Sequence, residues 1–125
     1  REREGLRIEV IDKADFSMFG LGTSKLAPRA QALIGEIARS IGPMPNRIKV
    51  RGHTDSIPYN APDRNNWSLS AERAEVTRQV ISARGVDPKR FARIEGVADT
   101  EPFNAADPLD PRNLRISITL MYRES

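Results

Sequence analysis

One segment of the 125-residue chain gathers most of the side chains that could do chemistry. It reads RGHTDSIPYNAPDRNNWSLSAERAEV, from Arg51 to Val76, and holds the only histidine and the only tryptophan. A carboxylate, Asp55, lies near its start, and a guanidinium, Arg73, lies near its end. An enzyme, a metal site and a binding pocket would each use these groups differently. From the residues alone, a salt bridge between Asp55 and Arg73 is the simplest interpretation, because surface ion pairs are common and each stabilises little.

The other reactive groups give little support to a metal site or to catalysis. His53 is a single histidine in a chain without cysteine, whereas zinc is held by three or four clustered ligands. We expect His53 to hydrogen-bond and fix the loop, and Trp67 to pack that loop against the domain rather than stack on a ligand. Asp55 with Asp99 or Glu95 could supply the carboxyl pair that glycoside hydrolysis needs. None of these acids lies in a motif with a recognised nucleophile or metal, so we expect neither an enzyme nor a cofactor.

The charged pair is expected on two elements that flank one loop. The polar and apolar residues of RIKVRG, residues 47–52, alternate as in a half-buried strand. The helix after the loop is predicted to begin near Ser68, a common N-cap residue, and to end at Gly85. Arg73 would then lie just inside that helix, and Asp55 just beyond the strand.

Hydrophobic periodicity predicts elements in the order β-α-β-α-β-β. Alternation with a period of two marks the strands, and apolar residues spaced by three and four mark the helices. The expected elements are strands at 6–12, 47–52, 92–97 and 114–122, and helices at 24–41 and 68–84. This pattern predicts an α/β fold of the α+β type, a two-layer sandwich with its helices on one face of the sheet.

Two groups of side chains are expected in the core. Met18 and Phe19 form an apolar pair in the segment before the first helix, which could be a short strand or an ordered loop. The buried side of the second helix is expected to carry apolar side chains one to two turns apart. These are Leu69, Val76, Val80 and Ala83.

Composition and length are those of one globular domain, residues 1–125, with 38% hydrophobic and 30% charged residues. The 20 basic residues are interleaved with 17 acidic ones, so the net charge of +3 does not indicate nucleic-acid binding. No apolar run is long enough for a transmembrane helix, and no secretory signal opens the chain. Because the chain begins with arginine, we expect a fragment of a longer protein, with any transmembrane segment upstream.

Four motifs in a fixed order carry a family signal. They are GHTD at 52–55, NWSLSAERA at 66–74, GVADTEP at 96–102 and RNLRISI at 112–118. This series resembles the OmpA-like peptidoglycan-binding domain and covers nearly the whole chain. GLRIEVID leading to SMF, HTDSIPY, and the tryptophan of NNWSLS resemble the flagellar motility protein B (MotB) branch of that family.

The resemblance implies a mixed sheet backed by two helices, a periplasmic location and noncatalytic binding of the peptidoglycan stem peptide. Many stem peptides carry meso-diaminopimelate, whose side chain ends in an ammonium group and a carboxylate. Within these motifs, Asp55 and Arg73 are predicted to form two walls of a pocket for that end. A guanidinium binds a carboxylate through two parallel hydrogen bonds, which lysine cannot do. The nearby helix N-terminus would add backbone N–H groups and its dipole.

The same resemblance extends the predicted ligand-binding set beyond the charged pair. Thr54 and Asn66 are expected to orient the ligand, and Leu69 and Arg115 complete the set. One position departs from the family pattern, which usually reads Asn-Arg-Arg before the last strand. Here the sequence is Asn-Leu-Arg, with Leu114 in the middle. If the missing arginine holds ligand in relatives, that contact is absent or replaced in this chain.

The MotB resemblance also implies partners. It predicts a homodimer that binds peptidoglycan, a MotA-type stator subunit reached through the upstream membrane segment, and the flagellar P-ring as a further candidate partner. The alternative is an OmpA-like anchor that belongs to an outer-membrane lipoprotein, a barrel protein or a secretion system. A cell-wall hydrolase is the remaining alternative.

Overall fold

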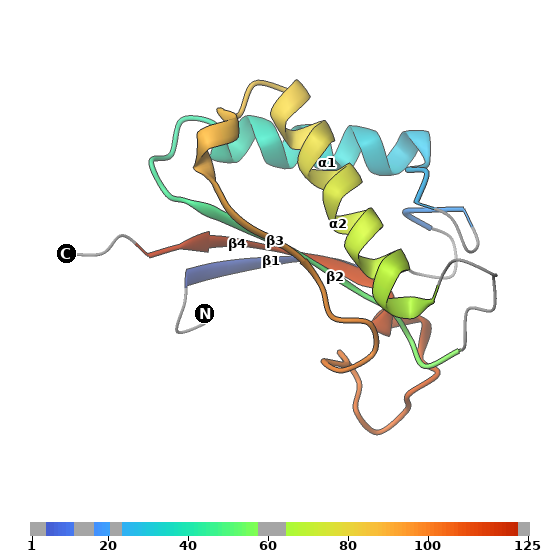
Figure 1. Cartoon of the computed structure of the whole chain (residues 1–125). Helices are drawn as coiled ribbons and strands as arrows, with labels where there is room; N and C mark the ends of the chain where they lie inside the picture. The colour runs from blue at the N-terminus through green and yellow to red at the C-terminus, as the bar shows by residue number, and fades with distance from the viewer. Residues whose placement is uncertain (1–4, 12–16, 21–23, 58–64, 123–125) are drawn as a thin grey trace.

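The computed structural model describes residues 5–11, 17–20, 24–57 and 65–122. Two helices cover one face of a four-stranded sheet, and the other face carries no helix (Figure 1). The strands are β1 (Gly5–Ile11), β2 (Ile48–His53), β3 (Phe91–Gly96) and β4 (Arg115–Met121), and the helices are α1 (Pro28–Ile41) and α2 (Asn66–Ala83). Short 3₁₀ helices at Pro88–Arg90 and Pro111–Asn113 precede β3 and β4.

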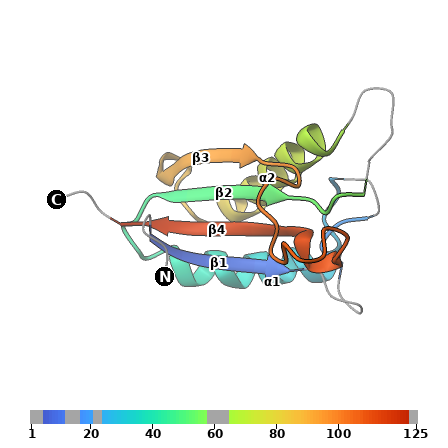
Figure 2. The same cartoon turned by 90° about the horizontal axis from the view of Figure 1, so that it is seen from below.

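The last strand of the chain lies inside the sheet, between the first two. The order is β1-β4-β2-β3, as Figure 2 shows. β4 runs antiparallel to both β1 and β2, whereas β2 and β3 are parallel and are joined through α2. A parallel pair needs such a crossover connection. The predicted two-layer sandwich, mixed sheet and element order are therefore confirmed.

Helix α1 begins later than predicted. The expected start near residue 24 is wrong because Leu26 forms an antiparallel bridge with Phe19, and Pro28 then occupies the first turn. Proline suits this position because its fixed φ is helical and the missing N–H would be unpaired there anyway. The predicted end at Ile41 is confirmed, and Gly42 donates the closing backbone hydrogen bond to Ala38.

Helix α2 begins earlier than predicted. Its N-cap is Asn65, whose side chain accepts from the Ser68 backbone N–H at 2.9 Å. The Ser68 hydroxyl in turn accepts from the Asn65 N–H at 2.9 Å. This is a capping box, in which two unpaired N–H groups are satisfied reciprocally. The prediction that Ser68 is the cap is therefore wrong by three residues, although Ser68 does take part in capping.

Small residues let α2 lie close to the carboxyl ends of β2 and β3. A Cβ atom on Gly52 would lie 2.1 Å from the carbonyl oxygen of Ser70, and one on Gly96 would lie 2.3 Å from the backbone nitrogen of Ala71. The first turns of α2 are thus fixed against β3 and against β2, the strand that leads into the Asp55 loop. This close contact sets the position of Arg73 relative to that loop.

The core lies between the helices and the sheet. Met18 and Phe19 are both buried in it, as predicted. On α2, Leu69 is buried and Val76 and Val80 are half-buried. Ala83 is exposed, contrary to prediction, because Ile81 takes the buried position in the last turn and a residue two positions further on lies on the opposite side of the helix. In the described part of the chain, no helix is long and apolar enough to span a membrane.

Candidate ligand-binding site

Asp55 lies in a loop that is held by the long connection between β3 and the 3₁₀ helix at Pro111–Asn113. The backbone N–H of Thr54 donates to the carbonyl of Ala98 at 2.8 Å, and that of Ser56 donates to the carbonyl of Pro108 at 3.0 Å. Asp55 between them is only 7% exposed. Its Oδ1 accepts a hydrogen bond from the backbone N–H of Ile57 at 3.1 Å. The carboxylate is therefore fixed in direction by the backbone that follows it.

Burial raises the pKa of Asp55 above its ordinary value, and the nearby carboxylate of Asp99 acts in the same direction. The Ile57 N–H and the charge of Arg73 oppose this rise without cancelling it. A buried carboxylate whose charge is incompletely compensated gains most from a ligand cation. The electrostatics of Asp55 thus favour binding of a positively charged group.

Arg73 extends from α2 toward the segment that precedes α1. It is 7% exposed, and its Nη2 donates to the carbonyl oxygen of Gly20 at 3.3 Å. Its guanidinium carbon lies 4.7 Å from the centre of the Phe19 ring. The ring and the carbonyl together restrain the guanidinium, the group that can bind a carboxylate bidentately.

Asp55 and Arg73 are near each other without forming a direct ion pair. The described contacts include no ion pair between these two side chains, but the charge of Arg73 lowers the pKa of Asp55. The arrangement therefore differs from the simple salt bridge that the residues alone suggested. The two-walled pocket stays a prediction, since Asp55 is not among the residues that line the hollow beside Arg73.

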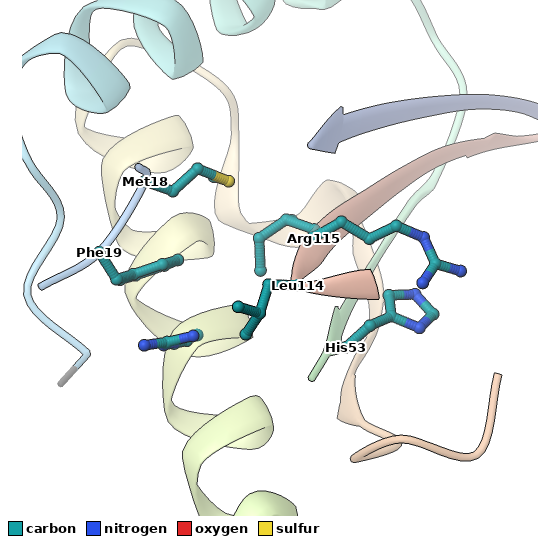
Figure 3. Close-up of a pocket in the computed structure, with 7 residues that line it drawn as sticks. Met18, Phe19, His53, Leu114 and Arg115 are labelled. Carbon is teal, nitrogen blue, oxygen red and sulfur yellow. The ribbon is translucent and has the colours of Figure 1, made fainter. Parts of the chain in front are cut away.

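A hollow of about 190 Å³, counting the solvent at its mouth, lies beside Arg73. In Figure 3, Phe19 and Leu114 face each other across it. Leu114 is the residue that stands where the family usually has arginine. Its place in the lining gives the hollow an apolar wall. The complete lining is Met18, Phe19, His53, Arg73, Leu114, Arg115 and Ile116.

The remaining predicted ligand-binding residues fall into two groups. Thr54 is buried and its hydroxyl donates to the carbonyl of Asp55 at 2.9 Å, while the side-chain amide of Asn66 donates to the carbonyl of Ile57 at 3.1 Å. Both therefore shape the Asp55 loop. Leu69 is buried, so its contribution is to position the first turns of α2.

Arg115 borders the hollow, but its guanidinium points elsewhere. The side chain runs toward His53 and away from Phe19, as Figure 3 shows. Its Nε donates to Glu9 at 2.5 Å, and its Nη2 donates to the carbonyl of Glu101 at 2.9 Å. Ile116 faces the helices, so alternation along β4 puts Arg115 on the opposite face of the sheet.

Sequence reasoning missed a buried polar network on that helix-free face. The Ser117 hydroxyl donates to the Glu9 carboxylate, and His53 Nε2 lies 2.8 Å from the same hydroxyl oxygen. Because the hydroxyl proton is directed at Glu9, its oxygen must accept, so His53 is the Nε2–H tautomer. Burial of this 2% exposed ring, assisted by the charge of Arg115, lowers its pKa to about 3. His53 does form a hydrogen bond, as predicted, but it bonds to Ser117 of β4 and not to the loop it was expected to fix.

This network is not arranged as a hydrolytic triad. In a triad the acid contacts the histidine, which activates the serine; here Glu9 contacts Ser117, and Ser117 is buried. The acids weighed as a hydrolase pair are also engaged. Glu95 is 2.5 Å from Arg51, and Asp99 accepts from Ser56 at 2.9 Å. No cluster of three or more metal-ligating side chains occurs among the described residues.

Trp67 does not pack as predicted. Its side chain is 55% exposed on the first turn of α2, so the expectation that it packs the loop against the domain is wrong. Burying an indole would stabilise the fold by several kcal/mol. The exposed Trp67 side chain therefore contributes little of this stabilisation to the fold.

Known proteins match this chain along most of its length. The model of the OmpA family matches residues 18–115. Motility protein B of Escherichia coli K12 is 34% identical over 98% of the chain, which spans 41% of that protein. The chain therefore covers less than half of this relative.

Solved structures share the fold. The periplasmic domain of Helicobacter pylori MotB superimposes with a TM-score of 0.84 and 21% identity, over 99% of this chain and 80% of that one. The cell wall anchor of the type VI secretion system (T6SS) of Pseudomonas aeruginosa superimposes with a TM-score of 0.76 and 30% identity, over 94% and 82%. The resemblance inferred from the motifs is confirmed: this chain belongs to the OmpA family and has the fold of a MotB periplasmic domain.

Proposed function

We propose that this domain binds peptidoglycan without cleaving it and anchors a flagellar stator to the cell wall. The observation that carries the proposal is the separation of Asp55 from Arg73, two buried and oppositely charged groups without a direct ion pair between them. The diaminopimelate end of a stem peptide carries the complementary ammonium and carboxylate. Asp55 would bind the ammonium group, and Arg73 the carboxylate.

The size and lining of the site suit a small part of a polymer. The hollow that Arg73 lines is small, so only the tip of a ligand could enter it. A ligand held at one polar tip binds with modest affinity, roughly micromolar to millimolar. A dimer that grips one polymer with two sites would gain from effective concentration. Such avidity suits a wall anchor that must withstand torque.

The stator assignment follows the MotB relative. On this proposal the domain would lie in the periplasm, downstream of a membrane segment that pairs with a MotA-type subunit, and the P-ring would be a candidate neighbour. The T6SS cell wall anchor supports a second assignment, since it is 30% identical to this chain. In that case the pocket chemistry would be the same, and the domain would anchor a secretion system or an outer-membrane protein.

Sedimentation with purified sacculi tests the pocket. Asp55→Ala and Arg73→Ala are each expected to abolish co-sedimentation, and Arg73→Lys to lose most of it because lysine cannot bind a carboxylate bidentately. Arg78→Ala is the matched control: Arg78 lies on the same helix and pairs with Glu75 at 2.6 Å on the surface. Unfolding midpoints of all variants are measured in parallel. Wall binding by folded Asp55→Ala and Arg73→Ala proteins would reject the site.

The same sacculi test the noncatalytic assignment. After long incubation with the domain, no soluble muropeptides are expected in the supernatant. Released fragments that increase with time and disappear in Asp55→Asn would show a hydrolase instead.

A further inference from the structure

One residue beside the Asp55 loop has an unfavourable backbone conformation. Ala98 has a φ of 52°, and in the described part of the chain it is the only non-glycine residue with a positive φ. Alanine rarely adopts this left-handed conformation, because its Cβ then approaches the following carbonyl oxygen. A strained residue of this kind persists only where the surrounding structure determines its conformation, and such residues cluster at functional sites.

The two backbone polar groups of Ala98 join α2 to the Asp55 loop. Its N–H donates to the hydroxyl oxygen of Ser70 at 3.1 Å, and its carbonyl accepts from the N–H of Thr54 at 2.8 Å. Ser70 lies on α2, three residues before Arg73, and Thr54 directly precedes Asp55. A single residue therefore connects the loop that carries the acid to the helix that carries the guanidinium.

This junction is buried and is held from the helix side. Ser70 is 0% exposed, and Ala98 is 3% exposed. The Ser70 hydroxyl donates its own proton to the carbonyl of Trp67 at 3.0 Å, so its oxygen is left to accept from Ala98. With the N–H of Ala98 fixed on α2 in this way, the left-handed turn directs the carbonyl of the same residue at the Asp55 loop.

Alanine makes this junction stiffer than glycine would. Glycine adopts a positive φ without strain, so it is the usual residue where the chain needs this conformation. Glycine also has access to many other conformations, most of which the Cβ of alanine excludes. A loop that is already ordered loses less conformational freedom when a ligand binds, and so binds more tightly.

We propose that Ala98 is a positioning residue, which holds the Asp55 loop at a fixed separation from Arg73. The proposal rests on the proposed function, in which one zwitterionic tip of the ligand contacts both charged groups. Ala98 does not touch the ligand. It acts through the Thr54 N–H on one side and the Ser70 hydroxyl on the other.

Removal of the Cβ tests this role, because both backbone hydrogen bonds can still form. In Ala98→Gly, calorimetry with a stem tripeptide ending in meso-diaminopimelate should show about a 3- to 10-fold loss of affinity and a less favourable entropy. The unfolding midpoint should stay within about 4 °C, because relief of backbone strain offsets the lost methyl group and the greater freedom of the unfolded chain. Ala98→Ser keeps a Cβ and should bind as the unchanged protein does.

The pH dependence of binding supplies a readout that a change in stability alone would not move. Burial raises the pKa of Asp55 in the folded protein. A looser loop in Ala98→Gly should let water reach this carboxylate, so the pH midpoint of binding should fall toward the ordinary aspartate value. In Ala98→Ser the midpoint should equal that of the unchanged protein.

Two further variants complete the test. Gly85, with a φ of 108°, follows the C-terminal end of α2, and an added Cβ there would meet no atom within 4 Å. Gly85→Ala should therefore lower the unfolding midpoint through backbone strain and leave peptide affinity unchanged. If Ala98→Gly binds the tripeptide as tightly as the unchanged protein, with the same pH midpoint, the positioning role is wrong. If Asp55→Ala keeps its affinity for the tripeptide, the pocket of the proposed function fails irrespective of Ala98.

Discussion

The guanidinium of Arg73 lies 4.7 Å above the ring of Phe19, and the carbonyl of the next residue, Gly20, accepts its hydrogen bond. A flexible arginine on a helix is thereby held from a segment more than fifty residues earlier in the chain. A cation over an aromatic face gains about 0.5–2 kcal/mol, depending on how far it is desolvated. If Arg73 binds a carboxylate as proposed, these contacts order its guanidinium before any ligand arrives.

Removal of the Phe19 ring should therefore weaken binding by releasing the guanidinium of Arg73 from its stacking contact. Phe19→Leu is expected to lower stem-peptide affinity about 3- to 10-fold, because the guanidinium must then be ordered at the moment of binding. Calorimetry should show this as a less favourable entropy. Leu26→Val is the control for stability, since Leu26 forms the bridge with Phe19 but does not touch the guanidinium in any described contact. If both variants lose the same amount of stem-peptide affinity, the effect of Phe19→Leu comes from reduced stability alone.

Ligand binding should depend on the ionisation of Asp55. Burial raises its pKa in the free protein, and only the ionised form attracts the ligand ammonium. Stem-peptide affinity is therefore expected to fall as the pH drops, with a midpoint above the ordinary aspartate value of about 3.9. Asp55→Asn should bind weakly and show no such titration. A midpoint below that value would contradict the electrostatic role assigned to Asp55.

Stability should decrease in mild acid because of His53. The folded protein holds this ring neutral with a pKa of about 3, whereas the unfolded chain protonates it near 6.5. Below pH 6.5 the unfolded state binds the extra proton, so stability falls by up to about 1.4 kcal/mol per pH unit. Hydrogen bonds from Ser117, Arg7 and Arg115 lower the pKa of Glu9 despite its burial, so Glu9 contributes only at lower pH.

Chemical denaturation from pH 7 to 4.5 measures this effect. His53→Gln, which keeps an N–H donor for Ser117, is expected to flatten the slope. NMR of the ring nitrogens should also report the neutral Nε2–H tautomer throughout that range. A slope that is the same in His53→Gln would assign the acid sensitivity to other groups.

The contact between α2 and β2 predicts a second stability effect. An alanine Cβ at position 52 would lie 2.1 Å from the carbonyl oxygen of Ser70, and the backbone there cannot move away cheaply. Gly52→Ala should cost at least about 1–3 kcal/mol, the usual range for overpacking. Gly42→Ala is the control, because its Cβ would lie 3.2 Å from the nearest oxygen and its φ is helical. If Gly52→Ala lowers the free energy of unfolding no more than Gly42→Ala does, the close contact between α2 and β2 is contradicted.

Periodic segments were the part of the fold that the sequence predicted well. Alternation located β1, β2 and β4, and a stripe of apolar residues located α1, because burial on one face imposes these periods. Helix starts were predicted less well. Asn65 and Ser68 are both good capping residues, and only the reciprocal hydrogen bonds of the folded chain show that Asn65 is the cap.

The polar network illustrates what a single sequence does not reveal. Ser117 is separated by 64 residues from His53 and by 108 residues from Glu9. These residues meet because β4 inserts between β1 and β2, and the order of elements along the chain does not specify that insertion. Alternation along β4 could have predicted that Arg115 points to the face opposite the buried Ile116. We placed Arg115 in the ligand-binding set because of the family motif instead.

The most direct test of the central claim changes the ligand and the protein together. Calorimetry compares a stem peptide ending in free diaminopimelate with one whose side-chain carboxylate is amidated, on the unchanged domain and on Arg73→Ala. If Arg73 binds that carboxylate, amidation should cost the unchanged domain at least about 2 kcal/mol, or roughly 30-fold in affinity. In Arg73→Ala, amidation should cost almost nothing. An equal cost of amidation in both proteins would show that Arg73 does not bind the carboxylate, and would contradict the account.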